Sequence, residues 1–326
     1  MTNPFVIEEI VETASKNGLW HYPFERGAKI QRALAQIFSR HLGGLRSGTR
    51  FETEGLLVTG KSGAGKTSEV NHIIKSFNAS GPILPDGRTA RIVSCMLDAK
   101  GGWKGLGTMT LAALGYPLAD TARNTQIQIW RKVIQQAKGQ GVVGIYYDEA
   151  QHIFRGKSER EQLAILDSLK TLMKSEEWPL ILIFSGVPEL HGYLYEEEQL
   201  FRLLTEVELK DIDLPQDFDT LHELVSNMAL DAGLDPAPTL ATEDFYHRLA
   251  TGAGFRWGLA IMITNRAIEA CHLVGGKILT VEHFVQGWMN KTGMAALASP
   301  FLNKHYVSAF PKDRLFWNQR VGEETA

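Results

Sequence analysis

The sequence predicts an α/β fold, in which a parallel sheet covered by helices is followed by a part built from helices alone. Three observations support this prediction. Apolar segments of strand length alternate with amphipathic helical segments over residues 55–190, a pattern typical of a parallel sheet with both faces covered. A glycine-rich turn joins the first expected strand to a helix. After Pro215 the strand-like segments cease, and the sequence favours helices to residue 290.

Each expected strand is a short apolar run bounded by turn-forming residues. The expected strands are 56–60, 90–97, 142–147 and 179–184. The last of these is expected to lie beside the first. The expected helices of the α/β part are 26–42, ended by Gly43-Gly44, and three segments with apolar residues at helical spacing: Val70, Ile73, Ile74 and Phe77; Ile127, Trp130, Val133, Ile134 and Ala137; Leu163, Leu166, Leu169 and Leu172.

We expect four parts along the chain. Residues 1–45 form a helical segment, 46–214 an α/β core and 215–290 a helical region with helices at 216–231, 242–251, 256–272 and 280–290. Residues 291–326 form a tail that is too aromatic to remain free in water and is expected to lie extended along another part. Its aromatic residues are Phe301, Tyr306, Phe310, Phe316 and Trp317.

Composition limits the class of protein. The 326 residues, 44% hydrophobic and 22% charged, suit an ordinary globular chain of about two folding units. We expect no membrane span, because a transmembrane helix needs about 18 or more apolar residues and the longest stretch without charge, 105–119, is interrupted by Gly and Pro. We expect no export signal, because the N-terminus carries acids where a signal peptide carries bases. The thiols of Cys95 and Cys271 suit a reducing cytoplasm.

The net charge of −3 neither indicates nor excludes nucleic-acid binding. Residues 21–50 form the main basic segment, and a solvated helix face is the alternative interpretation of its charges. Its bases are Arg26, Lys29, Arg32, Arg40, Arg46 and Arg50, against the single acid Glu25.

The most specific motif is GKSGAGKT at residues 60–67. Glycines let the backbone wrap a phosphate with its N–H groups, Lys66 can reach the β- and γ-phosphates, and the Thr67 hydroxyl can bind Mg²⁺. The helix that follows adds the positive end of its dipole. The nucleotide contacts expected from this loop are Gly60, Lys61, Ser62, Gly63, Ala64, Gly65, Lys66, Thr67 and Ser68.

An acidic pair, Asp148 and Glu149, follows the strand 142–147. After a phosphate-binding loop, Asp148 is expected to hold the Mg²⁺ ion with Thr67, while Glu149 polarises the attacking water. Glu149 favours hydrolysis over phosphoryl transfer to a second substrate.

Three further residues have two open interpretations each. Ser185, at the end of the strand beside the phosphate loop, either contacts the γ-phosphate or caps a turn. Arg202, at the end of a helix, either stabilises the transition state of a neighbouring subunit or pairs with Glu197 or Glu198. Arg256 either contacts nucleotide or is a surface charge at a helix start.

The segments GKSGAGKT, YDEAQH, SGVPEL, EEQLFR and GAGFRWGLA resemble those of the AAA+ ATPases of the TniB and TnsC type, which serve transposons. The resemblance covers roughly residues 18–290 and includes LWHYPFERGAKIQRAL. It implies a P-loop AAA+ core with a C-terminal helical lid. It makes Lys66 and Thr67 nucleotide ligands, Asp148 and Glu149 the Walker B pair, Arg202 a finger acting in trans and Arg256 a sensor-2 arginine.

This chain departs from the family at two points. The strand-end turn has Gly186-Val187 where the family usually has Gly-Thr, so Ser185 is a possible substitute for the γ-phosphate sensor. The finger region has Arg202 alone where the family usually has paired arginines.

The resemblance implies an ATPase that uses ATP and Mg²⁺. Such proteins assemble on double-stranded DNA as homo-oligomeric rings or filaments, recruit a DDE transposase with a target-selection protein, and disassemble on hydrolysis. Candidate DNA contacts are Lys100, Lys104 and Arg123, in loops before the strand 142–147, with Trp103 as an aromatic wedge. A solvated loop is the alternative for these residues. Alternative functions are helicase loading, secretion, protein remodelling, or a signalling switch of the STAND type.

Overall fold

The chain forms two compact units in the computed structural model, which describes residues 6–8, 10–11, 15, 21–97, 102–118 and 124–312. The sheet unit comprises Pro23–Ser62 and Lys66–Leu209. The helical unit comprises the chain from Lys210 onward, with Met1–Tyr22 and Gly63–Gly65. The division into four parts expected from the sequence remains a prediction.

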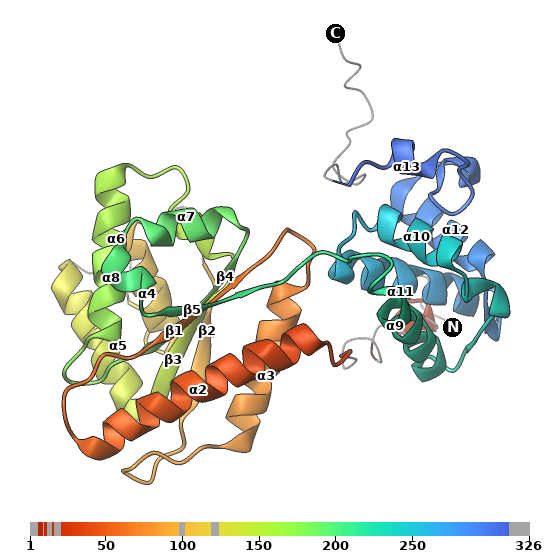
Figure 1. Cartoon of the computed structure of the whole chain (residues 1–326). Helices are drawn as coiled ribbons and strands as arrows, with labels where there is room; N and C mark the ends of the chain where they lie inside the picture. Colours follow the sequence, from red (N-terminus) through yellow and green to blue (C-terminus); the bar gives the residue numbers. More distant parts are fainter. Residues whose placement is uncertain are drawn as a thin grey trace. The chain divides into compact units, whose positions relative to one another are not determined.

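The sheet unit is built on five strands in the order β2-β3-β4-β1-β5 (Figure 1). Every neighbouring pair is parallel. The strands are β1 (Gly55–Thr59), β2 (Arg91–Cys95), β3 (Val142–Tyr147), β4 (Ile181–Gly186) and β5 (Leu204–Glu208). The three central strands β3, β4 and β1 are buried along their whole length, which explains their uninterrupted apolar sequences.

The four expected strands are confirmed, and so is the expectation that the fourth lies beside the first, because Val58 pairs with Ser185. The sequence analysis missed β5, which pairs with β1. This edge strand is only partly buried, and its LTEVE sequence follows a short helix. Two glutamates in five residues weaken the strand signal.

Two groups of helices cover the sheet. Helices α2 (Glu25–Ser47) and α3 (Lys66–Ser80) pack against each other and the sheet. Helices α4 (Trp103–Ala113), α5 (Gln126–Gln140) and α6 (Glu159–Met173) pack together as a second group, on the opposite side of the sheet in Figure 1. The short helices η1 (Ala150–Ile153), α7 (Glu189–Tyr195) and α8 (Glu198–Phe201) follow the ends of β3 and β4.

The predicted end of the first helix at Gly43-Gly44 is wrong. Helix α2 continues to Ser47 and ends at Gly48, whose φ of 64° is left-handed, a common helix ending. A Cβ atom on Gly44 would lie 2.6 Å from the ring of Phe51, whereas nothing lies within 4 Å of the corresponding position on Gly43. Gly44 therefore permits the ring of Phe51, which lies beyond the helix end, to pack closely against the helix.

The helical unit has a core of its own. Its elements are α9 (Phe218–Asp231), η2 (Pro238–Leu240), α10 (Glu243–Gly252), α11 (Trp257–Leu273), α12 (Val281–Thr292), η3 (Ala296–Ala298), α13 (Tyr306–Ala309) and a two-stranded sheet of β6 (Asp235–Pro236) with β7 (Ile278–Leu279). The four main helices confirm the expected ones. The small sheet was not expected.

The aromatic tail was expected to be extended, but it turns back into the helical unit through η3 and α13. The side chain of Phe301 is 4% exposed, and its ring lies 5.4 Å from that of Phe284 and 5.9 Å from that of Phe245. Arg248 donates hydrogen bonds to three carbonyl groups of this segment. Two of the five tail aromatics named above, Phe316 and Trp317, lie outside the described residues.

Substitution of the two helix glycines should have opposite effects. Gly43→Ala should raise the free energy of unfolding by about 0.5–1 kcal/mol, because alanine is the better helix former and meets open space. Gly44→Ala should lower it by about 1–3 kcal/mol, because the new Cβ overlaps the Phe51 ring. Urea denaturation of both variants and the wild type measures this, and equal stabilities would contradict the packing role of Gly44.

Candidate functional site

The phosphate loop occupies the turn between β1 and α3, as the sequence predicts. Gly63 and Gly65 have φ values of 83° and 96°, in the region that favours glycine. Helix α3 begins at Lys66, so the N–H groups of its first turn have no partner within the helix. The Lys66 side chain is 3% exposed, and its ammonium donates to the carbonyl oxygens of Gly60 (2.9 Å) and Lys61 (3.2 Å).

Adjacent strands bring Asp148 and Ser185 to this loop. Asp148 directly follows β3, and the Thr67 hydroxyl donates to its Oδ2 atom over 2.8 Å. The Ser185 hydroxyl, at the end of β4, donates to Asp148 Oδ1 and lies 2.8 Å from the Tyr146 hydroxyl. Burial raises the pKa of Tyr146, which keeps the phenol neutral. Asp148 is thus held from both sides.

Ser185 is fully buried. Its hydroxyl orients Asp148, a role intermediate between the two interpretations made from the sequence. Direct contact of Ser185 with a γ-phosphate remains a prediction. Tyr146, whose hydroxyl lies 2.8 Å from that of Ser185, was missed because the sequence gives it only as one apolar residue of a buried strand.

Glu149 has a left-handed backbone conformation, with φ of 49°, an uncommon state for a residue with a side chain. Its Oε1 atom lies 4.0 Å from the ammonium of Lys66. Its Oε2 atom accepts a hydrogen bond from the side-chain amide of Gln151. Gln151 is 2% exposed and was given no role from the sequence, because its burial, which requires a polar partner for the amide, is evident only in the structure.

The residues fit a nucleotide with Mg²⁺. Lys66 and the N-terminus of α3 supply the positive charge and N–H groups that phosphates require. Thr67 and Asp148, already in contact, supply hard oxygen ligands of the kind that bind Mg²⁺ together with phosphate oxygens. Among the described residues, no cluster of three or more His, Cys, Asp or Glu side chains forms a separate metal site.

The two candidate arginines lie in different units. Arg202 follows α8 at the helix end, as expected, and its side chain is 60% exposed. It lies 3.5 Å from Glu52. Of the partners proposed from the sequence, Glu197 instead pairs with Lys170 at 3.4 Å. An exposed pair of this kind contributes only about 0–1 kcal/mol, so Arg202 can leave Glu52 at little cost.

Arg256 precedes α11 in the helical unit and is 7% exposed. Its interpretation as a surface charge is therefore wrong. Contact with nucleotide remains a prediction.

The candidate DNA contacts are placed only in part. Lys104 was expected in a loop but lies in the first turn of α4, because Leu106, Thr110 and Leu111 bury one face of that helix. Lys100 and Arg123 lie outside the described residues.

The basic segment 21–50 is largely paired with acids. The ion pairs are Arg26–Glu69, Lys29–Glu25, Arg40–Glu54 and Arg50–Glu176. Three of these acids come from other segments of the sheet unit, so the local charge is lower than the sequence of the segment indicates.

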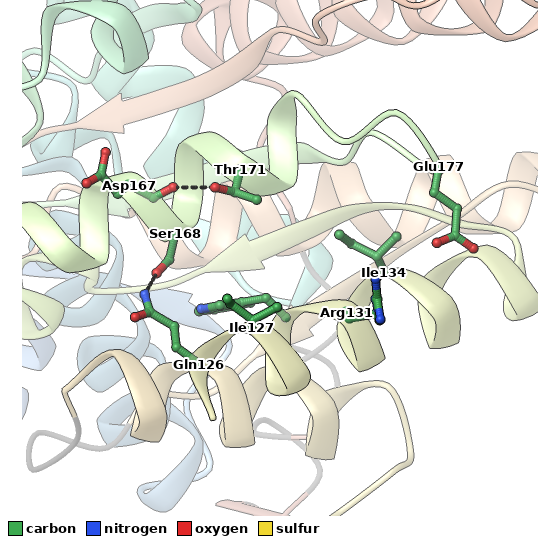
Figure 2. Close-up of a pocket in the computed structure, with 9 residues that line it drawn as sticks. Gln126, Ile127, Arg131, Ile134, Asp167, Ser168, Thr171 and Glu177 are labelled. Carbon is green, nitrogen blue, oxygen red and sulfur yellow. Dashed lines mark hydrogen bonds between the residues drawn. The ribbon is translucent and has the colours of Figure 1, made fainter. Parts of the chain in front are cut away.

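A surface groove of about 300 Å³ lies between α5 and α6 (Figure 2). Its lining residues are Gln126, Ile127, Trp130, Arg131, Ile134, Asp167, Ser168, Thr171 and Glu177. The side chain of Gln126 crosses from α5 to donate a 2.6 Å hydrogen bond to Ser168. None of the candidate nucleotide residues lines this groove.

No helix of the described part of the chain is long and apolar enough to cross a membrane. Cys95 and Cys271 are both buried, and neither forms a disulfide.

Comparison with known proteins supports the fold. The family model of the AAA domain matches residues 49–194. No curated protein sequence matches the chain. The structure is similar to the Aeropyrum pernix ORC1 protein, solved in complex with DNA, with a TM-score of 0.59 and 14% identity over 81% of this chain and 65% of that one. The matched part is therefore just under two thirds of ORC1.

Two other structures are similar over a larger share of their length. The Aeropyrum pernix ORC2 protein in its ADPNP–ADP complexes gives a TM-score of 0.57 and 15% identity over 86% of this chain and 72% of that one. Cdc6p of Pyrobaculum aerophilum gives a TM-score of 0.56 and 14% identity over 87% of this chain and 71% of that one. The chain therefore has a P-loop AAA+ fold with a helical C-terminal region.

Loss of the Ser185 hydroxyl should weaken Mg²⁺ binding. Ser185→Ala removes a hydrogen bond that orients Asp148, and residues that orient a metal ligand typically contribute about 10–100-fold in metal affinity. A Mg²⁺ titration of nucleotide binding measures this. Ser168→Ala is the matched control, because this buried serine donates to Ala164 in α6. Equal Mg²⁺ affinity of Ser185→Ala and Ser168→Ala would contradict the orienting role.

Proposed function

We propose that the chain is an ATPase that hydrolyses ATP to ADP and phosphate. The observation that carries the proposal is the convergence of Lys66, Thr67, Asp148 and Glu149 at the end of the phosphate loop, with Thr67 hydrogen-bonded to Asp148 and Glu149 4.0 Å from Lys66. The matches to the AAA domain and to ORC2 with bound nucleotides support it.

Each residue has a role that follows from its charge and position. The loop N–H groups and Lys66 bind the phosphates, and Lys66 offsets charge that develops on the γ-phosphate. Thr67 and Asp148 would hold Mg²⁺, which neutralises phosphate charge when bound. Glu149 accepts a hydrogen bond from the attacking water and orients it for in-line attack.

The finer proposal is a regulator of transposition that binds double-stranded DNA without sequence preference. In this role, ATP-bound copies assemble on target DNA and recruit a DDE transposase and a target-selection protein, and hydrolysis disassembles them. The resemblance of the sequence motifs to TniB and TnsC proteins supports it, as does the similarity of the fold to ORC1 solved with DNA. An adjacent transposase gene would favour it over helicase loading, secretion or protein remodelling.

Substitutions at Lys66 and Glu149 should separate nucleotide binding from hydrolysis. Lys66→Ala should weaken ATP binding at least about 100-fold, because the buried cation that faces the phosphates is lost. Glu149→Gln should bind ATP normally and lower kcat by about 10²–10³-fold. Fluorescent-nucleotide titration and phosphate release measure the two effects. Wild-type affinity in Lys66→Ala would overturn the site assignment.

Arg202 should act on the site of a neighbouring copy. Arg202→Ala and Lys66→Ala are each expected to be inactive alone, while a mixture forms some sites with both an intact P-loop and an intact arginine. Phosphate release across a series of mixing ratios measures this recovery. Arg50→Ala, which removes an exposed arginine paired with Glu176, should remain active. If the two variants assemble together but phosphate release does not recover at any mixing ratio, Arg202 is a surface ion-pair residue.

DNA binding should require ATP and weaken steeply with salt. Each phosphate contact that is removed should reduce the log–log salt slope by about 0.9 on duplex DNA, and lysine–phosphate contacts confer no base preference. Binding of Lys100→Ala/Lys104→Ala across a salt series measures this, with the exposed Lys277→Ala as the charge control. An unchanged salt slope in the double variant would exclude Lys100 and Lys104 as DNA contacts. If the wild type binds duplex DNA in no nucleotide state, protein remodelling becomes the favoured function.

A further inference from the structure

Gln151 connects two parts of the nucleotide site that are far apart in sequence. It lies in η1, directly after the acidic pair, and its side chain is 2% exposed. Its amide nitrogen donates to Glu149 Oε2. Its amide oxygen accepts from the backbone N–H of Val187, in the turn after β4, over 3.4 Å. This orientation of the amide is the only one that satisfies both partners, since a carboxylate only accepts and an N–H only donates.

Gly186 makes room for this connection. A Cβ atom at this position would lie 2.4 Å from Gln151 Oε1 and 2.8 Å from Leu190 Cδ2, both closer than real Cβ contacts allow. A residue with a side chain would therefore displace Gln151 from the turn. The carbonyl oxygen of Gly186 also accepts from the N–H of Gly60 over 3.2 Å, which attaches the same turn to the first residue of the phosphate loop.

These contacts close into a ring around the site. From Gly60 the ring passes to Gly186, through Val187 to Gln151, and on to Glu149. Glu149 Oε1 lies 4.0 Å from Lys66 Nζ, which donates back to the carbonyl oxygen of Gly60 over 2.9 Å. One buried side chain, that of Gln151, thus joins the turn after β4 to the Glu149 carboxylate.

We propose that Gln151 is a positioning residue that couples the Gly186-Val187 turn to Glu149, so that the state of this turn sets the orientation of the water-activating carboxylate. The inference rests on the proposed ATPase function and adds the element that controls Glu149. Val187 has no hydroxyl to contact phosphate, and its backbone N–H makes the connection instead. Gln151 acts through Glu149 and does not touch nucleotide in this role.

Two substitutions separate the two hydrogen bonds of Gln151. Gln151→Met keeps the volume of the side chain and removes both bonds. Gln151→Glu keeps an acceptor for Val187 but replaces the donor to Glu149 with a repelling carboxylate. Both should lower kcat on the order of 10²-fold, the effect of misplacing a reacting group by about 1 Å, while the KM for ATP and the affinity for ADP change less than about twofold.

A double-mutant cycle and a nucleotide-free measurement make the test specific. In a Glu149→Gln background, Gln151→Met should change the residual kcat less than about twofold, because a residue that acts through Glu149 has nothing left to position. Hydrogen exchange of the Val187 amide, resolved by NMR without nucleotide, should accelerate in Gln151→Met and remain slow in Gln151→Glu.

The outcomes are distinct. Wild-type kcat in both variants, fully additive effects in the cycle, or unchanged Val187 exchange in Gln151→Met would each overturn the proposal. Parallel losses of kcat and ADP affinity with a lowered melting temperature would assign Gln151 to stability alone, which also overturns it. If the wild type releases no phosphate, the proposed function fails, whereas the exchange of Val187 still tests the connection.

Discussion

The buried ammonium of Lys66 is the constraint on which the nucleotide site depends. A charge that is 3% exposed costs several kcal/mol unless nearby groups compensate it. Two carbonyl oxygens of the phosphate loop and the carboxylate of Glu149 supply that compensation. The carbonyl oxygens carry only partial charges, and Glu149 Oε1 lies 4.0 Å away, beyond hydrogen-bond distance, so the site still favours an anion such as a phosphate group.

The strand order serves this same point of the molecule. Because β4 lies between β3 and β1, the carboxyl ends of the three buried strands meet at one edge of the sheet, the usual ligand edge of α/β folds. Asp148 and the phosphate loop follow the ends of β3 and β1 directly, and Ser185 is the penultimate residue of β4. The hydrogen bonds among Tyr146, Ser185, Asp148 and Thr67 then restrict the Asp148 carboxylate to one orientation before any ligand arrives.

Local signals made the fold and the centre of the site predictable from the sequence. The glycine spacing of the phosphate loop and the acidic pair after a buried strand each lie within a few residues. The misses have a different origin. Gln151 acquires its role from Val187, 36 residues away, and Gly44 acquires its role from the ring of Phe51. The residues next to Gln151 or Gly44 in the sequence therefore do not indicate either role. Strand β5 was missed because pairing with β1, and not its own sequence, holds its two glutamates in an edge strand.

Val187 illustrates how the turn after β4 is joined to Glu149 without a side-chain hydroxyl. A threonine at this position offers a hydroxyl to the site, whereas valine offers only its backbone N–H. That N–H is directed to Gln151, whose amide has both a donor and an acceptor and can therefore join an N–H to a carboxylate. Such a connection fails with a side chain at Gly186, because the Cβ would occupy the space of the amide oxygen. The glycine, the glutamine and the glutamate consequently function as one unit, and a change in any of them alters the position of the other two.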